Sequence, residues 1–466
     1  MPPIYKTAHV KSLLKNPNLP TNDLKNYRPV ANLMFTFKLL ERVVAYQLKQ
    51  YLQENGLFSD AQSAYRQYHS TETAMLRVTN DLLLALDKGD EAVIVLLDYS
   101  ATFDTIDLEI FFKRLQNRYG IDGTVLNWFM SYLKDRSQAV VIDKTVSDSF
   151  PLPWGTPQGS VKGPLDFVMY TGPVSDVINA HKGIDHAIYA DDTQVYLVMR
   201  SSKQMDAVKK LEECVADVRA WAIANKLMLN DQKTEVVHFH SRHRKVSPLP
   251  ELCIGDAKIK ASDSARDLGI VLDSTLDLKQ HVSNICRAAS FGVYKIGRIR
   301  KYLNQAATKR LVHAFVTSRL DCNNSLLYGL PMCQLARLQL VQNAAARLVT
   351  LTRRREHISP ILHDLHWLRI KDRVAFKILL TAYKARHGIA PKYICDLLSV
   401  YTPKRNLRSA SQLLFEHGPR TKTKYGDRAF AVAAPRLWNN LPRNVRAATT
   451  ISSFKSKLKT HFFKLN

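Results

Sequence analysis

The stretch Tyr189-Ala190-Asp191-Asp192 joins two segments that favour β-strands. The apolar pair Ala187-Ile188 precedes it, and a β-branched and aromatic run at 193–199 follows it. Two such segments around a pair of acids predict a hairpin with carboxylates at its tip. Successive strand residues point to opposite faces, so the two acids are not equal partners in one site. Hard divalent cations bind several oxygen ligands, and we therefore expect a further carboxylate from elsewhere in the chain.

That carboxylate is predicted upstream, where the apolar run Val93-Ile94-Val95-Leu96-Leu97 is followed by Asp98. The run indicates a strand that is buried on both faces, with the acid at its end. An acid at this place beside an acidic hairpin is the arrangement that two-metal phosphoryl transfer needs. Acidic pairs in turns are more often simply solvated, and Asp191-Asp192 alone would leave that alternative favoured.

Four segments, taken in order along the chain, resemble successive palm motifs of reverse transcriptases. They are Leu97-Asp98-Tyr99-Ser100-Ala101-Thr102-Phe103-Asp104, Gly155-Thr156-Pro157-Gln158-Gly159-Ser160, Tyr189-Ala190-Asp191-Asp192 and Leu229-Asn230-Asp231-Gln232-Lys233-Thr234-Glu235. More narrowly, they are similar to the motifs of non-LTR retrotransposons (LINEs) of the jockey and chicken-repeat group. The order and spacing of the four motifs, rather than any single one, carry the resemblance.

The resemblance implies an α+β right-hand polymerase fold with an antiparallel palm sheet and a mostly helical, basic C-terminal region. It divides the chain into fingers (1–90), a palm with the catalytic site (91–240), a primer-grip-like sheet with a helical thumb (241–352), and a basic C-terminal region of retrotransposon type (353–466). The implied activity is RNA-directed DNA polymerisation. The implied partners are an RNA template, a DNA primer or target and dNTPs, and the implied cofactor is a pair of Mg²⁺ ions, with Mn²⁺ as a substitute.

The same resemblance assigns catalytic roles to four residues. Asp98, Asp191 and Asp192 are expected to bind the metal ions, with Asp98 and Asp191 as the main ligands. Lys233 is expected to approach the phosphates of the nucleotide and to protonate the leaving pyrophosphate, a role that suits a general acid. A surface lysine in a turn is the alternative interpretation of Lys233.

Four further residues are expected to bind the nucleotide. Arg66 is assigned to the triphosphate, because a guanidinium can grip phosphate with two hydrogen bonds. Phe103 is assigned as a steric gate against a 2′-hydroxyl. Gln158 and Gly159 lie in the loop that holds the templating base and the incoming nucleotide, where glycine permits positive φ. By position alone, Arg66 would be interpreted as solvated and Phe103 as a core residue.

Some features depart from the family pattern. Ala64 stands where glycine is usual, and Lys162 and Asp166 replace residues that are usually apolar. A buried unpaired charge is expensive, so these two residues favour a second hypothesis, a catalytically inactive nucleic-acid-binding remnant. A group II intron maturase, which shares the palm motifs, is a third. The apurinic-type endonuclease that usually precedes the polymerase is absent from the sequence, and we expect a truncated reading frame.

Composition agrees with a polyanionic partner. The chain has 67 lysines and arginines against 41 acids, a formal charge of +26 over 466 residues. Such an excess favours nucleic acid. The six cysteines have no metal-ligand spacing and are interpreted as reduced thiols. Because there is no apolar run long enough for a bilayer and no signal peptide, we expect a nuclear or cytoplasmic protein without membrane contact. The oligomeric state is unknown at this stage.

Several helices are predicted from periodicity. A helix over 35–54 is expected to pack into the core through Leu39, Leu40, Val43, Val44, Leu48 and Leu52. Further helices are predicted at about 108–118, after a cap near Ser70, and from about 278 to 352. In the last of these, basic residues alternate with apolar ones; they are Arg287, Lys295, Arg298, Arg300, Lys301, Lys309 and Arg310. A basic helical face suits contact with the phosphates of a duplex, although such a face is more often just solvated.

Overall fold

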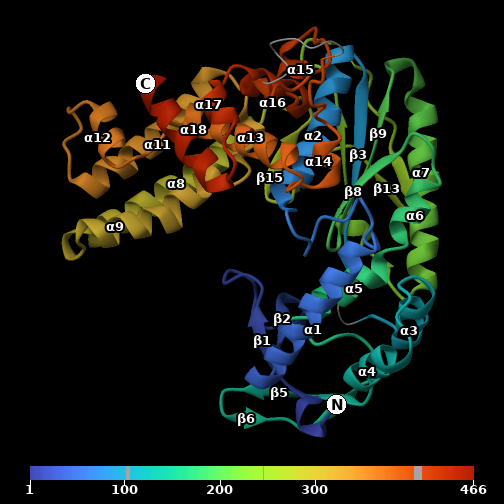
Figure 1. Cartoon of the computed structure of the whole chain (residues 1–466). Coiled ribbons are helices and arrows are strands. Elements are labelled where there is room, and N and C mark those ends of the chain that lie inside the picture. Colours follow the sequence, from blue (N-terminus) through green and yellow to red (C-terminus); the bar gives the residue numbers. More distant parts are fainter. Residues whose placement is uncertain (101–104, 245, 404–411, 466) are drawn as a thin grey trace.

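The computed structural model describes residues 1–100, 105–244, 246–403 and 412–465 (Figure 1). The chain folds around a four-stranded sheet in which all neighbouring strands are antiparallel. Across the sheet the strands are β11 (Glu235–Phe239), β3 (Glu91–Leu97), β9 (Asp192–Met199) and β8 (Asp185–Tyr189). The predicted hairpin is confirmed, since β8 and β9 are its two strands and the acids lie at its tip.

Strand β3 separates two hydrophobic cores. Val93 and Val95 pack into one core, and Ala92 and Ile94 pack into the other. All four side chains are completely buried. Because side chains alternate between the faces of a strand, a continuous apolar run is what two cores require. The predicted strand is confirmed, and Asp98 follows it directly.

A second sheet joins the N-terminal segment to the middle of the chain. Its strands are β2 (Tyr27–Asn32), β1 (Thr7–Leu14), β5 (Arg136–Ile142), β6 (Thr145–Val146) and β7 (Phe150–Leu152). Strand β1 pairs antiparallel with β2 and parallel with β5. In Figure 1 this sheet lies near helices α1 (Phe35–Glu54), α3 (Leu108–Asn117) and α4 (Gly123–Leu133), at the end of the molecule away from the C-terminal helices.

Helix α1 has the predicted bounds but buries a different face. Of the predicted core stripe, Leu48 and Leu52 are buried, whereas Leu39, Leu40 and Val43 are exposed. The buried residues of the helix are Phe37, Glu41, Ala45, Leu48 and Leu52. The first half of the predicted stripe is therefore wrong. The reason is that an acid faces inward, where it finds hydrogen-bond donors, and so rotates the apolar residues beside it toward solvent.

Three helices and three short strand pairs complete the N-terminal half and its junction with the rest. The helices are α5 (Gly163–Thr171), α6 (Val174–Asn179) and α7 (Gln204–Ala224). The strand pairs are β4 (Tyr99–Ser100) with β10 (Met228–Leu229), β12 (Leu252–Ile254) with β13 (Ala257–Ile259), and β14 (Ser264–Asp267) with β15 (Ile270–Asp273). The last two pairs lie within 241–352, the segment for which the resemblance implies a sheet.

The chain is mainly helical from residue 279 onward, as predicted. The helices are α8 (Lys279–Ile299), α9 (Gln305–Val312), α10 (Ser318–Asp321), α11 (Met332–Thr350), α12 (Ile358–Asp364), α13 (Ile370–Arg386), α14 (Lys392–Cys395), α15 (Lys424–Arg428), α16 (Phe430–Asn439), α17 (Arg443–Arg446) and α18 (Ile451–Leu465). Arg300 differs from the expectation of an exposed basic face, because it donates hydrogen bonds to the carbonyls of Leu348 and Val349 at the end of α11. With its antiparallel central sheet and helical second half, the structure confirms the α+β class.

Helix α2 (Thr71–Lys88) connects the central sheet to the C-terminal region. Ser70 caps it in a capping box with Thr73, as the sequence predicts. One side of α2 packs on β3 and β8, and other parts contact α14, α15 and α16. Among the described residues, no helix has the length and apolar character needed to cross a membrane, and the six cysteines are free thiols.

Candidate active site

The tip of the β8–β9 hairpin is a two-residue turn, because Tyr189 pairs with Asp192 across it. Ala190 in this turn has φ of 60°, a left-handed conformation that costs a residue with a side chain roughly 1–2 kcal/mol. Gln62 holds it there from both sides. Its side-chain carbonyl accepts a hydrogen bond from the amide of Ala190 at 3.0 Å, and its side-chain amide donates to the Ala190 carbonyl at 3.3 Å. The orientation of the acids is therefore fixed by a residue from a distant part of the chain.

The pairing of β4 with β10 brings Asp98 and Lys233 together. Strand β4 directly follows Asp98 at the end of β3, and β10 lies a few residues before Lys233 and β11. The amide of Asn230 donates to the backbone carbonyl of Asp98 at 2.8 Å, which fixes the start of the turn that carries Lys233. The Nζ of Lys233 lies 2.8 Å from Oδ2 of Asp98. The lysine side chain is 66 % exposed and the aspartate 27 %, so the pair lies at an open edge of the molecule.

The three carboxylates interact electrostatically with one another. Burial and the charge of Asp98 raise the pKa of Asp191. Asp192 is itself exposed, yet nearby protein atoms that displace water from one side, together with the charges of Asp191 and Asp98, raise its pKa to about 6. Two cations act in the opposite direction, because Arg28 and Lys233 lower the pKa of Asp191. The arrangement holds acids close together and sets positive charge around them.

The donor set is suited to a hard divalent cation, since carboxylate oxygens are its preferred ligands. Asp98 and Asp192 line one pocket, together with Lys233, Gln194 and Asp267. Mutual repulsion between these acids is what a bound cation would relieve. In the part of the chain that the structure describes, no three acidic, histidine or cysteine side chains converge closely enough to hold one ion.

The loop at 155–160 packs against strand β2. Gly159 has φ of 118°, and a Cβ at this position would lie 2.4 Å from the carbonyl oxygen of Ala31, so only glycine fits. The carbonyl of Gln158 accepts a hydrogen bond from the amide of Ala31 at 2.6 Å. Because β2 also carries Arg28, whose charge acts on Asp191, the loop belongs to the same side of the molecule as the acids.

Glu41 of α1 anchors the end of this loop from within the protein. Its carboxylate is completely buried and accepts hydrogen bonds from the hydroxyls of Tyr132 and Ser160 and from the amide of Val161. These donors satisfy an acid that would otherwise be costly to bury. The inward acid of α1, which the periodicity of the helix did not reveal, therefore connects α1 to the loop.

Lys162 and Asp166 are not unpaired charges. Both are completely buried, and the ammonium of Lys162 donates to both carboxylate oxygens of Asp166 at 2.6 Å, one helical turn away. The ammonium also lies 4.2 Å and 4.4 Å from the ring centroids of Phe129 and Tyr132. The sequence analysis treated Lys162 and Asp166 as unpaired buried charges, and this was wrong, because each charge is the partner of the other.

One of the predicted nucleotide-binding residues, Arg66, has its hydrogen bonds within its own loop. Arg66 donates through Nη1 to the carbonyls of Ser59 and Gln62 at 2.7 Å and 2.9 Å, and its guanidinium lies over the ring of Phe58. It thus stabilises the loop that precedes α2. Phe103 lies outside the described residues.

Two residues near the acids were missed by the sequence analysis. Arg28 is exposed on β2, and only the pairing of distant strands brings it to Asp191, so no local signal marks it. Asp267 is 4 % exposed and accepts a hydrogen bond from Gln194 at 2.8 Å. Burial, with the charge of Asp192 second, raises the pKa of Asp267 to about 7. Asp267 lies in the polar stretch 261–267, so no local signal marks it either.

Comparison with known proteins gives a family. The family described as "Reverse transcriptase (RNA-dependent DNA polymerase)" matches residues 14–272, more than half of the 466-residue chain. The chain is 26 % identical over 348 residues to "Probable RNA-directed DNA polymerase from transposon X-element" of Drosophila melanogaster, covering 73 % of this chain and 37 % of that protein. It is 24 % identical over 438 residues to "RNA-directed DNA polymerase from mobile element jockey" of the same species, covering 91 % and 45 %.

A third relative is "Probable RNA-directed DNA polymerase from transposon BS" of Drosophila melanogaster, 27 % identical over 365 residues that cover 75 % of this chain and 39 % of that protein. The chain thus spans less than half the length of these three curated relatives. Among solved structures, apo telomerase from Candida Tropicalis aligns with a TM-score of 0.45 and 12 % identity, covering 79 % of this chain and 63 % of that chain.

The buried ion pair predicts a non-additive pair of substitutions. Lys162→Met leaves Asp166 buried without its partner, and we expect a loss of about 3–5 kcal/mol in the free energy of unfolding. Lys162→Met combined with Asp166→Leu removes both charges and is expected to stay within about 1–2 kcal/mol of the wild type. Urea unfolding measures both. Lys144→Met, at an exposed turn, is the control, and a double variant no more stable than the single one would contradict the prediction.

Asp267 predicts a pH dependence of stability. Its pKa is about 7 in the folded protein against 3.8 for an ordinary aspartate, so the folded state binds the proton more tightly. Stability from this group is therefore complete below about pH 4 and is lost as the pH rises toward 7. Asp267→Asn removes this loss, and its stability relative to the wild type should increase across pH 4–7 in urea unfolding. Asp263→Asn, which is exposed, should show no such trend.

Proposed function

Because the chain belongs to the reverse transcriptase family, we propose that it synthesises DNA on an RNA template. The reaction is nucleotidyl transfer: the 3′-hydroxyl of a primer attacks the α-phosphate of a dNTP and loses its proton to solvent, and a new phosphodiester bond forms. The bond between the α-phosphorus and the oxygen that bridges it to the β-phosphate breaks, and the pyrophosphate leaves with a proton from a general acid. The substrates are accordingly an RNA template, a DNA primer or target end, and dNTPs. We assign the source of this polymerase to a non-LTR retrotransposon of the jockey type; the named relatives come from the transposons X-element and BS and from the mobile element jockey.

The observation that carries the proposal is the electrostatic proximity of Asp98 to the neighbouring acids Asp191 and Asp192 at one edge of the central sheet. Lys233 lies beside them and forms an ion pair with Asp98. Like charges placed close together in a partly buried site, where they raise the pKa of Asp191 and Asp192, are costly to the fold. Phosphoryl transfer gives such a group a purpose, since its transition state is stabilised mainly by positioning and by charge.

Asp98, Asp191 and Asp192 are the residues that would hold Mg²⁺, or Mn²⁺ in its place, with Asp98 and Asp191 as the main ligands. Two bound divalent ions would supply Lewis-acid activation of the primer hydroxyl and neutralisation of phosphate charge. The chain contributes the placement of these oxygens. Gln62 orients the Asp191 turn, and the β4–β10 pairing orients Asp98.

The cations beside the acids suit the phosphates of the nucleotide. In this proposal Lys233 exchanges its ion pair with Asp98 for the leaving pyrophosphate and delivers a proton from Nζ. Arg28, on the exposed strand β2, binds the triphosphate in place of Arg66, whose Nη1 is already used by two carbonyls. Gln158 and Gly159 contribute a close backbone surface for the base pair.

The larger architecture is the right-hand polymerase fold, and we assign its parts as fingers (1–90), palm (91–240), primer-grip-like sheet and thumb (241–352) and C-terminal region (353–466). In the thumb, Arg287, Lys295, Arg298 and Lys301 are exposed on or just after α8, so a duplex can be held through its phosphates in a salt-sensitive manner. A nuclear or cytoplasmic site of action is consistent with a nucleic-acid substrate.

A catalytically inactive nucleic-acid-binding remnant is the second candidate. The excess of 67 basic over 41 acidic residues supports binding in either case. Loss of binding at high salt is expected of both candidates, so only nucleotide incorporation separates them.

Primer extension on poly(rA)/oligo(dT) with magnesium tests the proposal directly. We expect the wild type to extend the primer and the Asp191→Ala, Asp192→Ala double variant to lose at least about 10²-fold in rate, because essential charge stabilisation is removed. Both proteins should bind the RNA–DNA duplex equally in a filter-binding assay. No extension by the wild type, with duplex binding retained, would leave the remnant as the function of this chain.

Arg28→Ala tests the assignment of the triphosphate contact. We expect the KM for dNTP to increase roughly tenfold or more, as is typical for loss of a hydrogen bond between charged groups, while kcat changes less. Arg28→Lys should recover part of the loss. Arg42→Ala, an exposed arginine on α1, is the matched control and should leave KM unchanged. If Arg66→Ala raised KM and Arg28→Ala did not, the assignment would have to be reversed.

A further inference from the structure

The short helix α14 of the C-terminal region lies beside α2 (Figure 1) and carries Tyr393. Tyr393 is 9 % exposed. Its hydroxyl oxygen lies 3.0 Å from Oγ of Ser63 and 3.0 Å from Oγ1 of Thr73. Tyr393 therefore makes two side-chain hydrogen bonds to segments more than 300 residues earlier in the chain.

The direction of these hydrogen bonds follows from the inventory of donors. The hydroxyl of Thr73 donates its only hydrogen to the carbonyl of Ser70 at 2.9 Å, so toward Tyr393 it can only accept. Tyr393 must then donate to Thr73, and Ser63 must donate to Tyr393. Removing the tyrosine hydroxyl alone would leave Ser63 without this acceptor, whereas Thr73 would still accept from the amide of Ser70 at 2.9 Å.

Ser63 belongs to the loop that holds the acid-bearing hairpin. Its amide donates to the carbonyl of Ile188 at 2.8 Å, and the amide of Ile188 donates to Ala61 at 2.9 Å. The residue between Ala61 and Ser63 is Gln62, whose side chain bonds both the amide and the carbonyl of Ala190. Tyr393 is thus connected through Ser63 to the turn that precedes Asp191.

The ring of Tyr393 is itself held in place. The guanidinium of Arg77 lies 5.6 Å from its centroid, and the ring of His69 lies edge-on at 5.6 Å. Burial raises the pKa of Tyr393, which keeps its hydroxyl protonated and able to donate. The position of the hydroxyl is therefore well defined.

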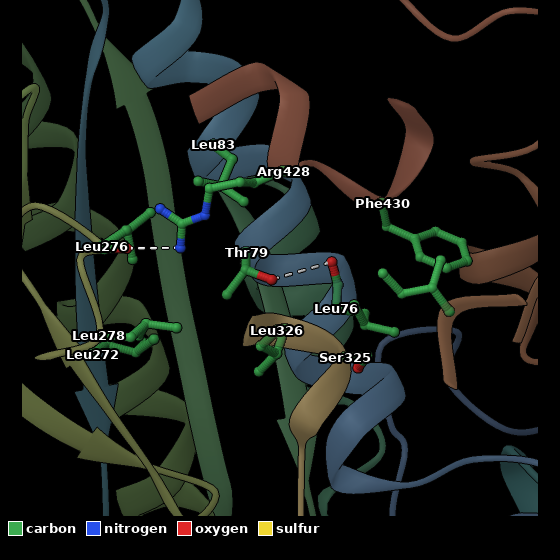
Figure 2. Close-up of a pocket in the computed structure, with 11 residues that line it drawn as sticks. Leu76, Thr79, Leu83, Leu272, Leu276, Leu278, Ser325, Leu326, Arg428 and Phe430 are labelled. Atoms are coloured by element: carbon green, nitrogen blue, oxygen red, sulfur yellow. Dashed lines mark hydrogen bonds between the residues drawn. The ribbon is translucent and has the colours of Figure 1, made fainter. Parts of the chain in front are cut away.

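The same region is also fixed at the far end of α2. The carboxylate of Asp87 accepts hydrogen bonds from the amides of Lys422 and Thr423, and a Cβ at Gly426 would lie 2.6 Å from Asp87 Cγ. Figure 2 shows Arg428 reaching past α2 to Leu276, whose carbonyl accepts a hydrogen bond from Arg428 at 2.8 Å. The C-terminal region is therefore attached along the length of α2, and Tyr393 is not on a loose appendage.

We propose that Tyr393 is a positioning residue for the active-site turn, and that the C-terminal region supports the orientation of Asp191 through the path Tyr393, Ser63, Gln62 and Ala190. The inference rests on the proposed function, because it names a further residue that the polymerase reaction needs. It gives the region at 353–466, which holds none of the candidate catalytic residues, a role in the alignment of the acids.

Tyr393→Phe in the full chain tests the proposal, since it removes only the hydroxyl. We expect kcat for primer extension to fall roughly threefold to tenfold, the usual consequence of losing a hydrogen bond, with the KM for dNTP and the duplex affinity unchanged. Ser63→Ala should have a similar effect. The double variant should lose little more than either single variant, because both act through one path. Lys392→Ala, which removes the neighbouring exposed ion pair to Asp60, is the matched control and should keep full kcat.

Hydrogen exchange at the Ala190 amide gives a readout that does not depend on activity. We expect faster exchange in Tyr393→Phe and Ser63→Ala than in the wild type and in Lys392→Ala, because this amide donates to Gln62. Unchanged exchange and unchanged kcat in Tyr393→Phe would overturn the proposal, as would additive losses in the double variant. A wild type without polymerase activity but with the expected exchange would refute the proposed function and retain the structural link.

Discussion

The burial of β3 on both faces is the constraint on which the rest of the structure depends. One strand supplies alternate residues to two cores, with Val93 and Val95 on one side and Ala92 and Ile94 on the other. Because the whole run is apolar, a shift of β3 by one residue would still place apolar side chains in both cores. The register is therefore set by the hydrogen bonds of β3 to β9 and β11. Packing on both faces therefore fixes the position of the end of β3, and with it the position of Asp98.

The acids on the neighbouring strand depend on a different kind of constraint. Ala190 has a left-handed conformation that an alanine does not favour, and it persists because Gln62 bonds both its amide and its carbonyl. Gln62 in turn lies in a loop between α1 and α2, and α2 is attached to the C-terminal region. The orientation of Asp191 thus depends on contacts between residues far apart in sequence. Loss of any one of these contacts is expected to change that orientation.

The sequence predicted those features that local pattern controls. The apolar run of β3, the hairpin with its acids, the bounds of α1 and the cap of α2 are all confirmed, because period, turn chemistry and capping act within a few residues. The buried face of α1 was wrong, since Glu41 faces inward only by virtue of Tyr132, Ser160 and Val161. Arg28 and Asp267 were missed for the same reason. Strand pairing across long separations brings them to the acids, and periodicity carries no information about that.

Lys162 and Asp166 show that the energetic cost of a buried charge depends on whether a residue of opposite charge lies beside it. Taken one at a time, either charge in a completely buried place would cost about 3–5 kcal/mol, a large part of the stability of a typical domain. Taken together they neutralise each other at one helical turn, inside a ring of aromatic side chains that also favours the ammonium. Random decay of a sequence supplies single charges far more readily than matched pairs. The two residues that most favoured an inactive remnant are therefore compatible with an intact core, and they no longer count against a folded polymerase.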